Sequence, residues 1–183
     1  ISGDGIVNEG VNSTKLGIKG SPTLAEHMQI ARDLFLVAYT GGKLHIPTIS
    51  TAKSVALIKE AKKKGLQVSC SVSAHHITLV DDELQFFDSK VKVTPPLRTK
   101  ADTKALQKGL KDGIIDMITS DHNPIDTEHK KLEFSLSKDG TIGLESLFGA
   151  VNTVIDIETT ITFIFTLSFL SYSEVSNLTL ERI

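Results

Sequence analysis

Hydrophobic and polar positions alternate along this chain with two periods, one typical of helices and one typical of strands. Between 23 and 39, apolar residues recur every three or four positions, which predicts an amphipathic helix. Thr23 is the expected N-cap, Glu26 completes a capping box, and Gly41 ends the helix. The expected buried face of this helix consists of Leu24, Met28, Ala31 and Phe35.

The same helical period predicts two further helices. One runs over 52–64 after Thr51 as N-cap, and the other covers 101–113. Their expected buried residues are Val55, Ile58, Ala61, Leu106 and Leu110. Short segments rich in valine and isoleucine predict strands at 43–46, 67–73, 90–94 and 114–119.

Most of these strands are joined through helices, which favours βαβ units and a parallel sheet, so the predicted fold class is α/β. No low-complexity stretch or internal repeat divides the chain. Helices expected at 143–155 and 173–183 flank an apolar run at 160–170. That run is too short to cross a bilayer and is expected to be buried, so no membrane association is predicted.

Composition narrows the classes of function. The chain has 183 residues, of which 40% are hydrophobic and 23% charged, as in ordinary globular proteins. A net charge of −2 does not supply the basic stripe that a nucleic-acid-binding protein needs. Cys70 is the single cysteine, so an intrachain disulfide is impossible, a thiolate zinc cluster is excluded, and a reducing, cytoplasmic location is expected.

Polar residues follow the predicted strands, where parallel α/β folds place their active sites. Asp121, directly after a strand, could ligate a metal or take a proton from water, or it could simply cap the next turn. His75 and His76 are adjacent, and neighbours on a strand face opposite ways, which favours structural roles for both. Arg98 could bind an anion or pair with a carboxylate.

Taken in order, the motifs "LGIKGSPTLAEHMQIARDLFLVAYTGGKLHIPTIST", "VSAHHITL", "VTPPLR", "ITSDHNP" and "GTIGLES" resemble the second half of the long-chain dihydroorotases of the amidohydrolase superfamily. The resemblance runs from about Gly5 to Asn152 in one register. It implies a (β/α)₈ TIM barrel of which this chain covers roughly the second half, with 1–155 in the barrel and 156–183 packing on it. It also implies zinc and the interconversion of dihydroorotate and N-carbamoyl-aspartate in pyrimidine biosynthesis.

The resemblance assigns roles to individual residues. Asp121 matches the catalytic aspartate, which is also a metal ligand in the family. Thr94, Ile142 and Gly143 fall at substrate-binding positions. His45 is the other metal-ligand candidate in the chain, although it matches a family histidine that is usually not a ligand.

Three positions depart from the family pattern. Thr48 stands where a metal-binding histidine is expected, Thr94 replaces an asparagine, and Ile125 replaces a substrate-contacting histidine. A threonine hydroxyl is a poor zinc ligand compared with imidazole. The resulting hypothesis is a dihydroorotase-like protein with impaired or altered activity.

Three interpretations follow. The chain belongs to a working cyclic-amide hydrolase with fewer metal ligands, to a non-catalytic homologue that supports aspartate transcarbamoylase, or to an α/β domain with an unrelated function. A (β/α)₈ barrel needs about 250 residues. The native polypeptide is therefore expected to be longer, or two chains to cover each other's open edges as a homo-oligomer.

Overall fold

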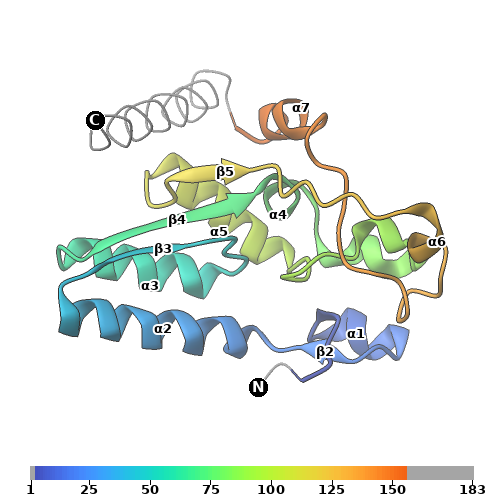
Figure 1. Ribbon diagram of the computed structural model, residues 1–183, viewed down its shortest axis with the longest axis horizontal. Coiled ribbons are helices and arrows are strands. Elements are labelled where there is room, and N and C mark those ends of the chain that lie inside the picture. Colours follow the sequence, from blue (N-terminus) through green and yellow to red (C-terminus); the bar gives the residue numbers. More distant parts are fainter. Residues whose placement is uncertain (1–2, 156–183) are drawn as a thin grey trace, which may run out of the picture.

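The computed structural model describes residues 3–155, so the expectations for 156–183 lie outside it. Figure 1 shows the arrangement of its elements. Their order is β1 (Val7–Asn8), α1 (Val11–Leu16), β2 (Gly20–Ser21), α2 (Thr23–Thr40), β3 (Lys43–Ile46), α3 (Ala52–Lys63), β4 (Gln67–Ser73), α4 (Ala74–Thr78), α5 (Lys100–Lys111), β5 (Met117–Thr119), α6 (Thr127–Lys130) and α7 (Leu147–Asn152). Two short 3₁₀ helices, Asp81–Phe86 and Ser89–Val91, lie between α4 and α5.

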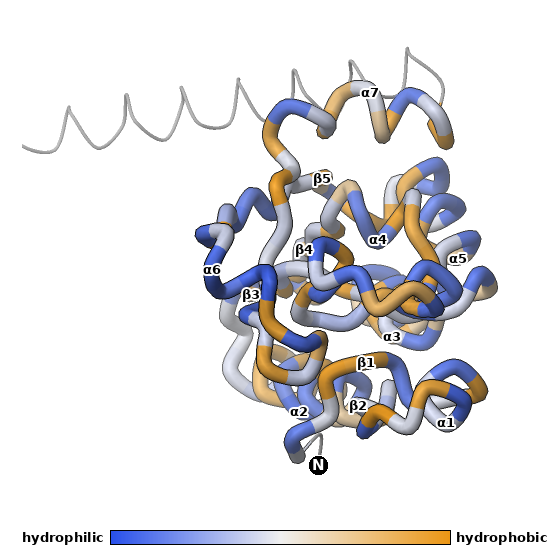
Figure 2. Tube along the Cα trace, turned by 90° about the vertical axis from the view of Figure 1, so that its right-hand side faces the viewer, coloured by the Kyte–Doolittle hydropathy of each residue, from blue (hydrophilic) through white to orange (hydrophobic). Residues whose placement is uncertain are grey.

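The main sheet contains three parallel strands in the order β3-β4-β5. Helix α3 joins β3 to β4, and the segment containing α4 and α5 joins β4 to β5. These crossovers confirm the predicted α/β class, because parallel neighbours need a helical connection of this kind. A second, two-stranded parallel sheet pairs β1 with β2 and was not predicted. Figure 2 shows β1, β2 and α1 at the opposite end of the molecule from β5 and α7.

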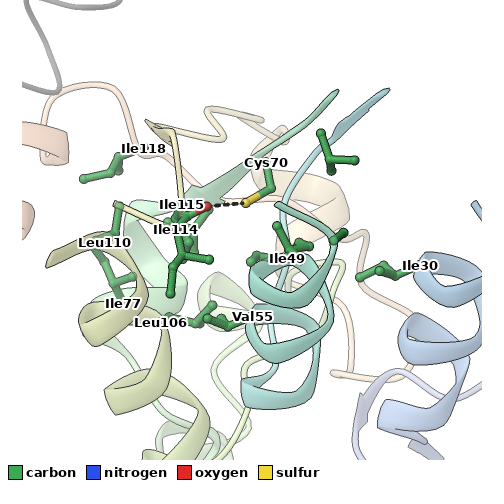
Figure 3. Close-up of a cluster of buried hydrophobic side chains, with 14 of the residues drawn as sticks. Ile30, Ile49, Val55, Cys70, Ile77, Leu106, Leu110, Ile114, Ile115 and Ile118 are labelled. Carbon is green, nitrogen blue, oxygen red and sulfur yellow. Dashed lines mark hydrogen bonds between the residues drawn. The ribbon is translucent and has the colours of Figure 1, made fainter. Parts of the chain in front are cut away.

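Helices α2, α3 and α5 cover one face of the main sheet. Leu34 of α2, Ile58 of α3 and Leu106 of α5 belong to one buried cluster with Cys70 and Val72 of β4. Figure 3 shows the centre of this cluster, where the Cys70 thiol points toward the Ile114 carbonyl oxygen at 3.6 Å. Because strand side chains alternate, the residues between the core positions face the other way.

Helices α3 and α5 form as their patterns predict. The Thr51 side chain accepts a hydrogen bond from the Ser54 backbone amide, and Thr99 caps α5 in the same way through Asp102. Each cap satisfies a backbone N–H that has no partner within the helix. The five expected inward residues are all buried: Val55, Ile58, Ala61, Leu106 and Leu110.

Helix α2 buries a different face from the predicted one. The expected residues are exposed, with Leu24 at 53% and Phe35 at 73%, whereas Ile30 and Leu34 are buried. The N-cap is Pro22, and Glu26 does not form a capping box but accepts hydrogen bonds from the loop after β3. The sequence offers two apolar faces on α2, and the packing of this helix against α3 and the sheet selects the second.

The segment expected to form a strand at 90–94 is a 3₁₀ turn followed by a loop. Its backbone makes turn and loop hydrogen bonds instead of strand pairs. The Lys92 amide donates to the Ser89 carbonyl oxygen, and the Lys92 carbonyl oxygen accepts from the Gly140 amide. The Lys92 ammonium is buried and donates to the Ser137 carbonyl at 2.5 Å. The segment of alternating lysines and valines therefore packs against the 135–140 loop and is not a strand of the sheet. Within 3–155, no helix is long and apolar enough to cross a membrane.

Candidate functional site

The carboxyl ends of β3, β4 and β5 lie at the same edge of the sheet because the three strands are parallel. Thr48 follows β3 and Asp121 follows β5, and both have positive φ, at 49° and 45°. Left-handed backbone is tolerated by aspartate but is strained for a β-branched threonine. Strained backbone of this kind clusters at functional sites in proteins, so both loop positions are candidates.

Asp121 lies beside His75, which is in the first turn of the short helix α4, directly after β4. The His75 Nε2 atom is 3.5 Å from Asp121 Oδ2, and the two side chains are 8% and 36% exposed. Burial lowers the pKa of His75 below its ordinary value, and the negative charge of Asp121 partly opposes this effect. The pair is thus a buried imidazole facing a partly exposed carboxyl group.

His76 is a structural residue, as the sequence indicated. Its Nδ1 lies 2.5 Å from the Ser73 hydroxyl and its Nε2 lies 3.0 Å from the Pro95 carbonyl oxygen. The carbonyl can only accept, so Nε2 carries the proton and Nδ1 accepts from Ser73. Burial, together with the neighbouring His75, lowers the pKa of His76 to about 3. The sequence did not predict that α4 is helical at both histidines.

His45 lies on the face of β3 opposite the core, where its Nδ1 is 2.8 Å from the Ser69 hydroxyl. It is in register with Ser69, whereas Thr119, just before the Asp121 loop, is in register with Ser73. Ser69 and Ser73 are four positions apart, which is roughly 13 Å along a strand. The structure therefore does not bring His45 to Asp121, and the assignment of His45 as a metal ligand stays a prediction.

Thr94 and His45 line the same cavity of about 360 Å³, together with Thr48 and the ion pair of Arg98 with Glu26. The Thr94 hydroxyl donates to the Asp139 carboxylate at 2.6 Å, and the Thr94–Pro95 peptide is cis. This cavity lies between the first half of α2, strand β3 with the loop that follows it, and the 94–98 segment. It is one place where a ligand could meet several of the predicted residues.

Arg98 is buried, and its contacts favour the second of the two roles considered for it. Its guanidinium donates to the Ser50 hydroxyl, to the Asn8 side chain and to the Ser21 carbonyl, each at 3.0 Å. The Glu26 carboxylate lies 3.9 Å away and gives it a counter-charge. Arg98 therefore ties the loop after β3 to α2 and to the β1-β2 sheet.

Gly143 lies directly against the loop that carries Asp121. A Cβ atom at this glycine would stand 2.1 Å from the Ser120 carbonyl oxygen. The Gly143 and Leu144 backbone amides donate to His122 Nδ1 at 3.3 and 3.2 Å. Two loops more than twenty residues apart thus meet beside the catalytic candidate.

Ile142, the neighbouring substrate-binding candidate, is 66% exposed. It lines a second cavity, of about 440 Å³, together with Ile125 and with Lys90 and Lys130. The position where the family pattern has a substrate-contacting histidine therefore contributes an apolar side chain to a cavity with a cationic rim.

The described residues do not fit a zinc site by themselves. Residues 3–155 contain no group of three or more histidine, cysteine, aspartate or glutamate side chains placed to hold a metal ion. A threonine stands at the end of β3, and Asp121 has one imidazole within reach. A zinc site needs about four ligands, most of them nitrogen or sulfur.

Comparison with known proteins gives a consistent family of relatives. The dihydroorotase of Thermoanaerobacter sp. (strain X514) is 45% identical over 153 residues, which are 84% of this chain and 36% of that enzyme. The dihydroorotase of Pelotomaculum thermopropionicum is 45% identical over 151 residues, 82% of this chain and 35% of the relative. The chain is similar to part of a dihydroorotase. It spans about a third of the length of the dihydroorotases it matches, and no protein-family model matches it.

Solved structures agree with the dihydroorotase resemblance. The L-hydantoinase (dihydropyrimidinase) from Arthrobacter aurescens matches with a TM-score of 0.71 and 26% identity, over 77% of this chain and 33% of its own. The dihydropyrimidinase from Brevibacillus agri matches with a TM-score of 0.66 and 27% identity, over 72% of this chain and 30% of its own. The fold is a mixed α/β unit that matches part of an amidohydrolase barrel, which confirms the predicted relationship.

Proposed function

We propose that this chain forms the second half of a cyclic amidohydrolase barrel that interconverts dihydroorotate and N-carbamoyl-aspartate. The 45% identity to dihydroorotases carries this proposal, and the position of Asp121 after the carboxyl end of β5 supports it. Residues 1–155 are assigned to the barrel. The assignment of 156–183 to a packing segment stays a prediction.

In the hydrolytic direction, a water molecule attacks the ring amide carbonyl and the ring C–N bond breaks. The Asp121 carboxylate accepts one proton from the attacking water and returns it to the departing N–H, which becomes the NH2 of the carbamoyl group. The carbonyl carbon becomes a carboxylic acid, which releases the second water proton to solvent. The partial exposure of Asp121 keeps it accessible to both water and substrate. Zinc is the cofactor that the resemblance implies, but no step is assigned to it because the described residues do not fit a zinc site.

Substrate contacts are assigned to Thr94, Ile142 and Gly143. The Gly143 region supports this assignment best, because its backbone lies against the Asp121 loop. A small dicarboxylate ligand would also suit the cationic rim of the cavity at Ile142. The Thr94 hydroxyl would have to leave Asp139 before it could donate to a ligand.

The test is hydrolysis of dihydroorotate by the native polypeptide that contains this chain, beside its Asp121→Asn variant. Asparagine keeps the shape but cannot accept the proton, so kcat should fall by about 10² to 10⁴. Zinc content of the dialysed protein, measured in parallel, reports whether other parts of the polypeptide supply ligands. A folded wild-type protein without turnover contradicts the proposal.

A second candidate is a non-catalytic homologue that supports aspartate transcarbamoylase. Three positions favour it: Thr48 offers no imidazole, the Thr94 hydroxyl is engaged by Asp139, and Ile125 is apolar. This candidate predicts a stable complex with the transcarbamoylase in size-exclusion chromatography and no bound zinc. Turnover of dihydroorotate by the protein alone excludes it. A homo-oligomeric state stays a prediction for the same chromatography.

A further inference from the structure

The His75 side chain is buried without a role in the hydrophobic core. Its ring nitrogen Nε2 has no hydrogen-bond partner among residues 3–155, although buried polar atoms in proteins nearly always have one. The acceptor facing it is Asp121 Oδ2, at 3.5 Å. This separation is about 0.5 Å longer than a normal N–H···O bond. Catalytic hydrogen bonds are often long before substrate binds and shorten afterwards.

The orientation of the His75 ring is set by its neighbours. Ser73 caps α4 by accepting from the His76 backbone amide, and the His76 ring is held at both nitrogens by Ser73 and Pro95. The His75 ring packs on this fixed ring, with centroids 4.6 Å apart and planes tilted by 44°. Contact with the fixed His76 ring therefore restricts the His75 ring to an orientation that faces the Asp121 loop.

Asp121 needs such a support. It follows β5 with a left-handed backbone, and its side chain is 36% exposed, so solvent alone would leave the carboxylate free to rotate. An imidazole N–H that donates to one carboxylate oxygen fixes the orientation of the group. The second oxygen then stays available for a proton from water.

We propose that His75 is a positioning residue whose Nε2–H donates to Asp121 Oδ2 and holds that carboxylate in the orientation required for proton transfer. This role rests on the proposed hydrolase function. It differs from the structural role of His76, whose two ring nitrogens bond to Ser73 and to the Pro95 carbonyl oxygen and not to the carboxylate.

Two substitutions separate positioning from packing in the native polypeptide. His75→Leu removes the donor and fills the space, and His75→Gln keeps an amide N–H near the position of Nε2. His75→Leu should lower kcat for dihydroorotate hydrolysis by about 100-fold with little change in KM, because misplacement of a reacting group has effects of that size. His75→Gln should recover most of the loss.

Controls use a second histidine–aspartate pair on the surface. His129 Nδ1 lies 2.6 Å from Asp126 Oδ2, with both side chains exposed, so His129→Leu should leave kcat unchanged. Adding His75→Leu to Asp121→Asn should lower kcat no further, because the two residues act as one unit. Additive losses, a change confined to KM, or equal damage from leucine and glutamine would each overturn the proposal.

A readout without catalysis distinguishes this proposal from the function on which it rests. ¹⁵N-histidine NMR spectra should show the His75 proton on Nε2. The chemical shift of that nitrogen should change in Asp121→Asn, while the shifts of the His129 ring nitrogens should not. If the protein lacks turnover but shows this response, the contact exists and the hydrolase proposal fails. If His75 carries its proton on Nδ1 or ignores the Asp121 substitution, the positioning role fails whatever the activity.

Discussion

His45 and Ser69 stand opposite each other on β3 and β4, joined by a 2.8 Å contact between Nδ1 and the hydroxyl oxygen. This pairing holds the imidazole on the outer strand β3, level with Ser69 and roughly 13 Å along the strands from the level of Ser73, near which Asp121 emerges. We therefore expect His45→Ala to lower kcat of the native polypeptide by less than about 3-fold, a small effect for a residue outside the reacting centre.

The comparison for this test is Asp121→Asn in the same assay. If His45→Ala lowers zinc content and kcat as strongly as Asp121→Asn does, His45 is a metal ligand and the strand register in solution differs from the pairing of His45 with Ser69.

His76 should make stability depend on pH. Its pKa is lowered to about 3 in the folded protein, against 6.5 for the free side chain. Below pH 6.5 the unfolded chain therefore binds a proton that the folded chain does not, and stability falls as pH drops from 6.5 toward 3. The slope from this group reaches about 1.4 kcal/mol per pH unit. His75 and His27, whose pKa values are also lowered by burial, act in the same direction.

Urea unfolding at several pH values between 7.5 and 4.5 measures this slope. His76→Gln should flatten it, while the exposed His45→Gln should keep the wild-type slope. A His76→Gln variant with an unchanged slope would show that His76 is not the group responsible.

Removal of one partner of the Glu26–Arg98 ion pair should cost much more stability than removal of one partner of an exposed pair. Glu26 accepts hydrogen bonds from the Ser50 amide at 3.0 Å and from the Ser50 and Ser54 hydroxyls, and Arg98 is 4% exposed. Glu26→Ala leaves these donors and the buried guanidinium without their acceptor. We expect a loss of about 3 to 5 kcal/mol in the free energy of unfolding.

Glu60 provides the matched control, because its 2.8 Å pair with Lys64 has both side chains about two-thirds exposed. Glu60→Ala should change the same free energy far less than Glu26→Ala does, because water screens an exposed pair. Similar losses from both substitutions would contradict the role given to burial.

Much of the fold could be predicted from the sequence where the signals are local. Thr51, Val55 and Ile58 specify α3 by a cap and one apolar stripe, and a single face is available to bury. Helix α2 was predicted as a helix but with the wrong face, because Leu24 and Leu34 lie on two apolar faces and only tertiary packing selects between them.

The candidate site likewise has features that local sequence predicts and features that only tertiary contacts determine. Asp121 could be found because it directly follows a strand, whereas its contact with His75 joins residues 46 positions apart and depends on the ring of His76. One local signal was available and missed: Ser73 before "AHHIT" is a normal N-cap for α4. A helical assignment would have placed both histidines on one turn at the sheet edge.

Cys70 should be inert to thiol reagents in the folded protein. It is fully buried, and desolvation raises its pKa to about 12, so almost no thiolate exists at neutral pH. Iodoacetamide labelling followed by peptide mass spectrometry should modify Cys70 only in denaturant. Labelling in native buffer at the denatured rate would show that the helical face of the sheet is open.

Gly143 tests the contact between the two loops beside Asp121. Gly143→Ala places a Cβ atom 2.1 Å from the Ser120 carbonyl oxygen, so one loop must move, and Ser120 precedes Asp121. We expect kcat to fall by about 100-fold, since small shifts of a reacting group have effects of this size. Gly149→Ala in α7 is the matched control: its Cβ meets nothing within 4 Å, and the helix should gain about 0.5 to 1 kcal/mol. If Gly143→Ala keeps full activity, the 140–144 loop does not position Asp121 and its assignment to substrate binding loses its structural support.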